Sequence, residues 1–114
     1  MIEGVKMSSG REYLTLILEQ LSELRGISYR PMMGEFLLYC RGKLFGGIYD
    51  NRLLVKPARA AVEYLRTVSY EAPYPGAKEM LLVDDVDDKA YLTGLVEAML
   101  PELPEPKRKS GGNL

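Results

Sequence analysis

The chain contains no histidine, and it has only one cysteine, Cys40. Histidine is the commonest general base and the commonest transition-metal ligand in proteins, so its absence excludes zinc sites of the Cys/His type and Ser/His or Cys/His nucleophile pairs. A lone cysteine cannot form an internal disulfide, which is typical of a reducing compartment. We therefore expect a cytoplasmic protein that is not an enzyme and that carries no cofactor.

Long apolar runs and an excess of positive charge are also missing. No apolar stretch approaches the roughly 18 residues that span a bilayer, and the first ten residues, MIEGVKMSSG, lack the apolar region of a signal peptide. The formal net charge is −1, whereas a protein that coats a nucleic-acid duplex carries a strong positive excess. The 114 residues, of which 46% are hydrophobic and 27% charged, are typical of one ordinary soluble domain.

Three segments show the spacing of an amphipathic helix. The first runs from about Gly10 to Leu24, where Ser9 and Glu12 have the spacing of a capping box. Pro57 fits the first turn of the second helix. The carboxylates of residues 85–88 favour the start of the third helix, because they accept the free N–H groups there. The apolar positions are Tyr13, Leu14, Ile17, Leu18, Leu21 and Leu24, then Ala58, Ala61, Val62 and Leu65, then Tyr91, Leu92, Leu95, Val96 and Met99.

Between the first two helices lie short segments rich in aromatic and aliphatic residues, which predict strands at 27–33, 35–40, 44–49 and 52–56. Gly42 and Asn51 suit the positive φ angles of hairpin turns between them. An edge strand near 68–71 and a strand at 79–84 follow the second helix. The order predicts an α+β domain, a two-layer sandwich in which helices pack on one antiparallel sheet of about five strands.

The middle strands are apolar at nearly every position, as in Phe36-Leu37-Leu38-Tyr39. Such strands are covered on both faces, or by helices on one face and by a partner chain on the other. We assign residues 9–103 to the domain, 1–8 to a disordered N-terminal extension and 104–114 to a disordered tail. Met7 is a candidate natural start, because the patterned sequence begins just after it.

Two constellations have both a functional and a structural interpretation. Asp84, Asp85, Asp87 and Asp88 place four carboxylates in five residues, which suits Mg²⁺ or Ca²⁺, but the run lacks the glycine and the distal glutamate of an EF-hand loop. We favour a strand end followed by a helix N-cap. The pair Gly46-Gly47 lies inside strand-like sequence, whereas phosphate loops run from a strand into a helix. We expect a bulge there, or a close approach of a helix to the sheet.

Cys40 and the basic run Lys107-Arg108-Lys109 also have two interpretations. Cys40 lies in an apolar strand, so we expect a buried and unreactive thiol. The basic run offers contacts to nucleic-acid phosphates, but the nearby Glu102 and Glu105 weaken it, which favours a solubilising tail.

Four charged residues among the strands form the candidate interaction surface: Arg30, Glu35, Arg52 and Lys56. Charges on a sheet either bind a partner or protect an exposed edge, and both interpretations stay open here. We assign no catalytic, cofactor-binding or metal-binding residue.

Residues 29–58 resemble the N-terminal domain of the TfoX/Sxy family. The matching elements are Arg30 followed by Met32-Met33-Gly34, a Tyr39 strand, Phe45-Gly46-Gly47 with Tyr49, and Leu54-Val55-Lys56. The run Tyr74-Pro75-Gly76-Ala77-Lys78-Glu79-Met80 and the acidic start of the last helix are similar to the short, stand-alone form of that family in many bacteria. The resemblance covers residues 11 to about 103 and implies a two-layer fold similar to secretion-chaperone-like domains.

The founders of that family regulate competence for DNA uptake and carry a second, C-terminal domain, which we do not expect here. The resemblance supplies no catalytic residues. We therefore expect a noncatalytic regulatory or protein-interaction module with a protein partner, and a homodimer is the simplest way to cover apolar sheet surface. One alternative is a nucleic-acid-associated accessory protein acting through Arg30, Lys43, Arg52, Lys56 and the tail. Another is a small-molecule or metal-binding domain that uses the acidic run.

Overall fold

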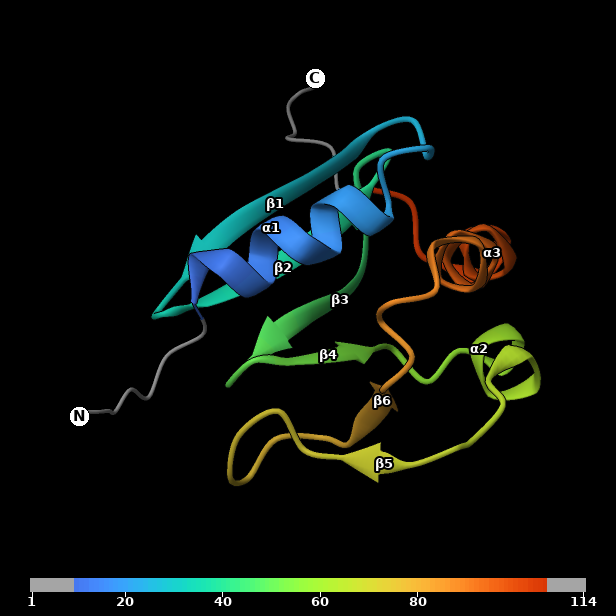
Figure 1. Cartoon of the computed structure of the whole chain (residues 1–114). Helices are drawn as coiled ribbons and strands as arrows, with labels where there is room; N and C mark the ends of the chain where they lie inside the picture. Colours follow the sequence, from blue (N-terminus) through green and yellow to red (C-terminus); the bar gives the residue numbers. More distant parts are fainter. Residues whose placement is uncertain (1–9, 107–114) are drawn as a thin grey trace, which may run out of the picture.

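The computed structural model describes residues 10–106, and these confirm the predicted α+β order of helices and strands (Figure 1). The sheet has six strands rather than about five, in the order β1-β2-β3-β4-β6-β5, and each neighbouring pair is antiparallel. The elements are α1 (Arg11–Gln20), β1 (Ile27–Met32), β2 (Glu35–Cys40), β3 (Lys43–Tyr49), β4 (Arg52–Val55), α2 (Arg59–Tyr64), β5 (Tyr70–Glu71), β6 (Met80–Val83), α3 (Lys89–Met99) and the 3₁₀ helix η2 (Leu100–Glu102).

Tight turns of two residues join the first four strands into a meander. Both residues of each turn have a positive φ angle, which is the type I′ geometry that matches the right-handed twist of a hairpin. The predicted turns at Gly42 and Asn51 are therefore confirmed. The three turns are Met33-Gly34, Arg41-Gly42 and Asp50-Asn51.

The strand register gathers one set of apolar side chains on a single face of the sheet, called here the core face. Phe36 pairs with Ile48, Ile48 with Leu53, and Leu53 with Val83, so these four share a face. All three helices contribute to the same buried cluster, and in Figure 1 α1 lies across β1 and β2 while α2 and α3 lie side by side. The helical members include Leu14, Ile17, Ala61, Leu92, Leu95, Val96 and Met99.

The glycine pair of β3 is required by packing. The register between β2 and β3 shifts at Leu38, which confirms the predicted bulge. A Cβ at Gly46 would overlap the carbonyl oxygen of Leu54 and lie 2.9 Å from the Cα of Val55. A Cβ at Gly47 would lie 2.7 Å from the carbonyl oxygen of Phe36 and 2.8 Å from Cε2 of Tyr49. The close approach therefore comes from the neighbouring strands β4 and β2 and from a tyrosine ring, and not from a helix.

The helix ends differ from prediction in two places. The helix α1 ends at Gln20, four residues before Leu24, and its N-cap is Gly10 without a side-chain cap; the Ser9 of the predicted capping box lies outside the described residues. The placement of Pro57 in a first helical turn is wrong, because α2 begins after Ala58. The backbone N–H of Lys56 still donates to Phe45 across the sheet, which keeps the chain extended there.

The segment after α3 lies against the β2–β3 hairpin. Lys43 Nζ donates to the Leu100 carbonyl at 3.1 Å and lies 3.5 Å from a Glu105 carboxylate oxygen. Leu103 is 5% exposed and belongs to the core. The described chain thus continues past the predicted domain boundary at 103 as far as Pro106, while the basic run 107–109 lies outside the described residues.

Candidate interaction surface

Strand β1 is an edge strand with little cover, since five of its six residues are exposed. Three large apolar side chains in this strand and its turn reach solvent: Tyr29 is 39% exposed, Met32 41% and Met33 94%. Met33 also has a φ angle of 53°, a conformation that bulky L-residues rarely adopt. At the hairpin tip, an apolar side chain is thus exposed to water and its backbone adopts a disfavoured conformation. Such strained residues are typical of binding sites.

The backbone groups that β1 presents to solvent follow from its register with β2. The Arg41 N–H donates to the Gly26 carbonyl at 2.8 Å, so the even-numbered residues of β1 exchange bonds with β2. The N–H and C=O groups of Ile27 and Tyr29 then point away from the sheet. Pro31 occupies the next outward position, where its missing N–H costs no ladder bond.

An apolar groove of about 570 Å³ lies between α1 and this exposed edge. Its lining includes Leu18, Leu21, Leu24, Ile27 and Tyr29. The Tyr29 ring meets the Phe36 ring edge-on, with 5.9 Å between the ring centres. Unpaired backbone groups and an apolar groove thus lie next to each other along β1.

The four polar residues predicted as an interaction surface share the face opposite the core, called here the outer face. Arg30 pairs with Leu37, and alternation places Arg30, Glu35 and Arg52 on this face. Lys56 continues the same alternation just past the end of β4. Arg30 is exposed, whereas Glu35 is half-buried and its carboxylate accepts the Asp50 N–H of the β3–β4 turn at 3.1 Å. That these four bind a partner stays a prediction.

Arg52 fixes the start of the loop between β5 and β6. Its Nη1 lies 2.6 Å from the Glu71 carboxylate, its Nη2 donates to the Pro73 carbonyl at 3.2 Å, and its Nε donates to the Tyr49 carbonyl at 3.1 Å. Within the described residues the guanidinium is thus engaged on three sides. It ties two hairpins together, which leaves it little capacity for a partner.

The middle of the outer face is largely covered by the chain itself. Leu54, at the centre of this face, is 0% exposed, and Tyr49 is 7% exposed. Burial raises the pKa of the Tyr49 hydroxyl, with smaller contributions from Tyr74, Glu35 and Tyr39. Of the described residues, the large apolar side chains that are exposed lie instead on β1 and its turn, near β5, and in the β5–β6 loop. The candidate surface is therefore the β1 edge rather than the centre of the sheet.

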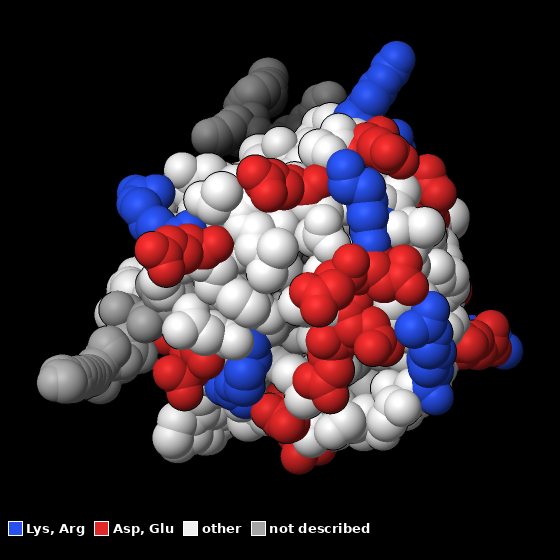
Figure 2. All heavy atoms as spheres, viewed as in Figure 1, with Lys and Arg blue, Asp and Glu red and all other residues white. Residues whose placement is uncertain are grey.

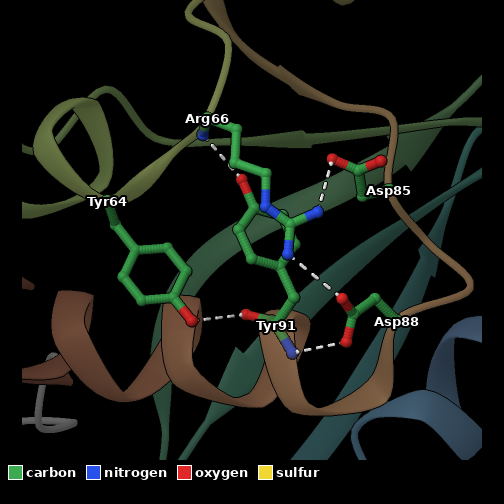
Figure 3. A network of polar contacts seen from close by, with 5 residues as sticks. All are labelled: Tyr64, Arg66, Asp85, Asp88 and Tyr91. Atoms are coloured by element: carbon green, nitrogen blue, oxygen red, sulfur yellow. Dashed lines mark hydrogen bonds and ion pairs between the residues drawn. The ribbon is translucent and has the colours of Figure 1, made fainter.

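The acidic run belongs to a network that joins α2 to α3. Figure 2 shows acidic side chains gathered over the β6–α3 connection, and Figure 3 shows the Arg66 guanidinium between Asp85, at 3.4 Å, and Asp88, at 3.1 Å. The guanidinium carbon lies 3.9 Å from the centre of the Tyr91 ring. Tyr64 stacks on the same ring with 5.3 Å between centres, and its hydroxyl donates to the Tyr91 carbonyl.

Asp88 confirms the predicted N-cap. Its carboxylate accepts the Tyr91 N–H at 3.1 Å, and this bond, followed by the one from Arg66, lowers the pKa of Asp88. Over residues 10–106, no group of three or more acidic or cysteine side chains has the geometry to hold a metal ion. In the described structure Asp88 caps the helix, and Asp85 and Asp88 pair with Arg66.

Cys40 is fully buried, as predicted, and its Sγ lies 3.5 Å from the Arg25 carbonyl, to which the thiol donates. Burial raises the pKa of this thiol. The thiol therefore stays protonated near neutral pH and serves as a small core side chain.

Sequence reasoning missed the exposed tip and the Arg66 network. The signal for the tip was present, because a Met-Gly turn between two strands requires a positive φ angle at Met33. Arg66 carried no comparable signal, since its partners come from elements that pair only in the folded chain.

Two comparisons place these features among known proteins. The family model described as the TfoX N-terminal domain matches residues 19–93, a range that includes all six strands. A protein of Spirochaeta aurantia, described as "Uncharacterized 12.7 kDa protein in trpE 5′ region", is 32% identical over 102 residues, which is 89% of each chain. No solved structure matches. No helix in residues 10–106 has the length and apolarity to cross a membrane.

Proposed function

The chain belongs to the TfoX N-terminal domain family, and we propose that it is a noncatalytic regulatory module that binds a protein partner through the β1–β2 hairpin. The observation that carries this proposal is Met33, an apolar side chain that is 94% exposed at φ 53°. Asparagine or glycine would suit this turn position better in an isolated protein. A partner that buries the side chain explains why methionine occupies it, since methionine adapts well to irregular apolar surfaces.

The neighbouring residues support the same surface. Tyr29 on the core face and Met32 on the outer face add exposed apolar side chains on the two sides of the strand, and Arg30 adds one exposed charge on the outer face. Tyrosine, methionine and arginine are the residue types enriched in protein interfaces. A cytoplasmic location is part of the proposal and is supported by the single, buried cysteine.

The nucleic-acid alternative finds less support in the charges. Of its four cations in the described chain, Arg52 is held by Glu71 and three backbone carbonyls, and Lys43 by the Leu100 carbonyl and Glu105. Arg30 and Lys56 remain, on a protein with a net charge of −1. These two cations are too few to neutralise several phosphates of a nucleic acid, and it is that neutralisation which releases the counterions that drive binding.

Met33→Asn tests the proposal without unfolding the hairpin. The variant creates an Asn-Gly turn, the most favoured type I′ sequence, so we expect it to be more stable by about 1 kcal/mol. Tagged wild-type and variant proteins are used to capture partners from native cells, and bound proteins are quantified by mass spectrometry. Val68→Ser is the matched control, because Val68 is 43% exposed near the opposite edge of the sheet.

The expected result is a set of proteins that wild type and Val68→Ser retain and Met33→Asn loses. The proposal is overturned when all three proteins retain the same set, or when wild type retains nothing beyond an unrelated tagged protein.

A further inference from the structure

We propose that two copies of this chain pair through their β1 strands, antiparallel and about a two-fold axis at Tyr29. The proposal rests on the proposed function, because it names a second copy as one partner of the same hairpin. It extends the six-stranded sheet across the axis and uses the outward backbone groups of Ile27 and Tyr29.

The outward groups restrict the possible registers. Only odd-numbered residues of β1 present unpaired backbone groups, so a two-fold pairing is centred on a residue and not between two residues. Strand β1 runs from Ile27 to Met32, so centring on Tyr29 or on Arg30 overlaps the most residues. A pairing centred on Ser28 uses only the first part of the strand.

Pro31 and Arg30 then distinguish the two long registers. Centred on Tyr29, the two copies exchange two bonds at Tyr29, and each Ile27 N–H donates to the Pro31 carbonyl of the other copy. Pro31 has no N–H to return in either register, but centred on Arg30 the outward residues of the strand form only Tyr29–Pro31 pairs, so fewer bonds form than with the additional Tyr29–Tyr29 pair. That register also places two Arg30 side chains directly opposite each other, which is destabilising. The Tyr29 register places Ser28 opposite Arg30 instead.

The side chains on the core face fit the same register. Tyr29 is 39% exposed and borders the groove lined by Leu18, Leu21 and Leu24. In the Tyr29 register the two tyrosine rings meet across the axis, and the second copy covers the open side of each groove. Aromatic pairs of this kind stabilise strand pairing. The net charge of −1 per chain opposes association only weakly.

Disulfide trapping tests the register directly. Ser28 and Arg30 form a non-hydrogen-bonded pair in the Tyr29 register, with about 4.5 Å between Cα atoms, which is within the roughly 4.4–6.8 Å that a disulfide spans. The variants S28C, R30C and the double variant S28C/R30C are oxidised mildly and run on non-reducing gels. The native chain is the control for Cys40, which is fully buried.

We expect covalent dimers from the double variant and from neither single variant. Dimers from S28C alone or from R30C alone place the axis at that residue and overturn the Tyr29 register. A double variant that stays monomeric also overturns it.

Sedimentation of the wild-type chain over a concentration series tests association itself. We expect reversible dimers, and a chain that remains monomeric at every concentration overturns the self-pairing. The proposed function is tested by a different experiment, in which the captured proteins are compared between wild type and Met33→Asn. Met33 is a turn residue outside the paired strand, so failure of one proposal can be distinguished from failure of the other.

Discussion

The backbone N–H of Arg66 donates to the Tyr91 hydroxyl at 2.8 Å, while the Arg66 guanidinium carbon lies 3.9 Å from the centre of the same ring. One tyrosine of α3 therefore holds both the main chain and the side chain of the residue that follows α2. This contact sets where the chain leaves α2 and turns back toward β5 (Figure 3).

Tyr91→Phe should lower the free energy of unfolding by about 1 kcal/mol, because it leaves the Arg66 N–H without its acceptor while keeping the ring. Urea denaturation followed by circular dichroism measures the change. Tyr70→Phe is the control, since Tyr70 is 49% exposed. Equal stability of the two variants would contradict a structural role for the Tyr91 hydroxyl.

Asp88→Asn should be less stable than wild type at neutral pH, and the difference should shrink as the pH falls below about 4. The folded state lowers the pKa of Asp88 through the Tyr91 N–H and Arg66. Its charged form therefore stabilises the fold above the unfolded-state pKa, and this contribution is lost as the pH falls through the folded-state pKa. Asparagine keeps the N-cap, so the comparison isolates the charge.

Thermal unfolding from neutral to acidic pH measures this difference. Asp87→Asn removes a charge from the same connection and controls for net charge. A difference between wild type and Asp88→Asn that stays constant down to the lowest pH would contradict the prediction.

Gly46→Ala should destabilise the fold by about 3 kcal/mol or more, because the new Cβ meets the backbone of β4, which cannot move without breaking the sheet. Gly10→Ala is the control, since the nearest atom to its new Cβ is 4.0 Å away. Chemical denaturation of both variants measures the effect. If Gly46→Ala lowers the free energy of unfolding no more than Gly10→Ala does, then β3 and β4 separate easily.

Arg52→Gln should lower stability by about 1–3 kcal/mol and should expose the β5–β6 loop, because the charge-assisted bonds to Glu71 and Pro73 are lost. Limited trypsin digestion, with cleavage after Lys78 followed by mass spectrometry, reports on the loop. Arg59→Gln is the control, since Arg59 pairs with Glu63 on an exposed helix turn, where a pair contributes little. The prediction fails if both variants are cut after Lys78 at the wild-type rate.

The periodic and turn-forming parts of this fold were predictable from sequence. The apolar spacing of α1 and α3 and the glycine and asparagine turns predicted the helices and the meander, because they depend on local backbone preferences. The ends of α1 and α2 were predicted less well. Pro57 suits a helix start, but the bond from Lys56 to Phe45 keeps the chain extended for longer, and a sequence does not show that competition.

The candidate surface was predictable only in part. Arg30, Glu35 and Arg52 were expected among the strands as part of one interaction surface, and alternation places them on one face. The engagement of Arg52 by Glu71 depends on a loop that closes far along the chain. The exposure of Tyr29 depends on β1 being an edge strand, and the strand order is set only when β6 pairs with β4. Pairing between distant segments thus decides which of several apolar strands stays exposed.

The two-residue turns also bear on how this chain folds. Strands β1 to β4 pair only with neighbours next to them in sequence, whereas β6 reaches β4 across α2 and β5. Low contact order shortens the conformational search, so we expect the meander to form first and β6 to dock later. Pulse-labelled hydrogen exchange should then protect Leu38 and Ile48 before Leu81 and Val83, whose N–H groups face β4 because the Leu82 N–H donates to Ser69. Simultaneous protection would contradict this order. During that interval the edge of β4 is unpaired as well as the edge of β1, so the nascent chain has a transient second site for aggregation that the native protein closes.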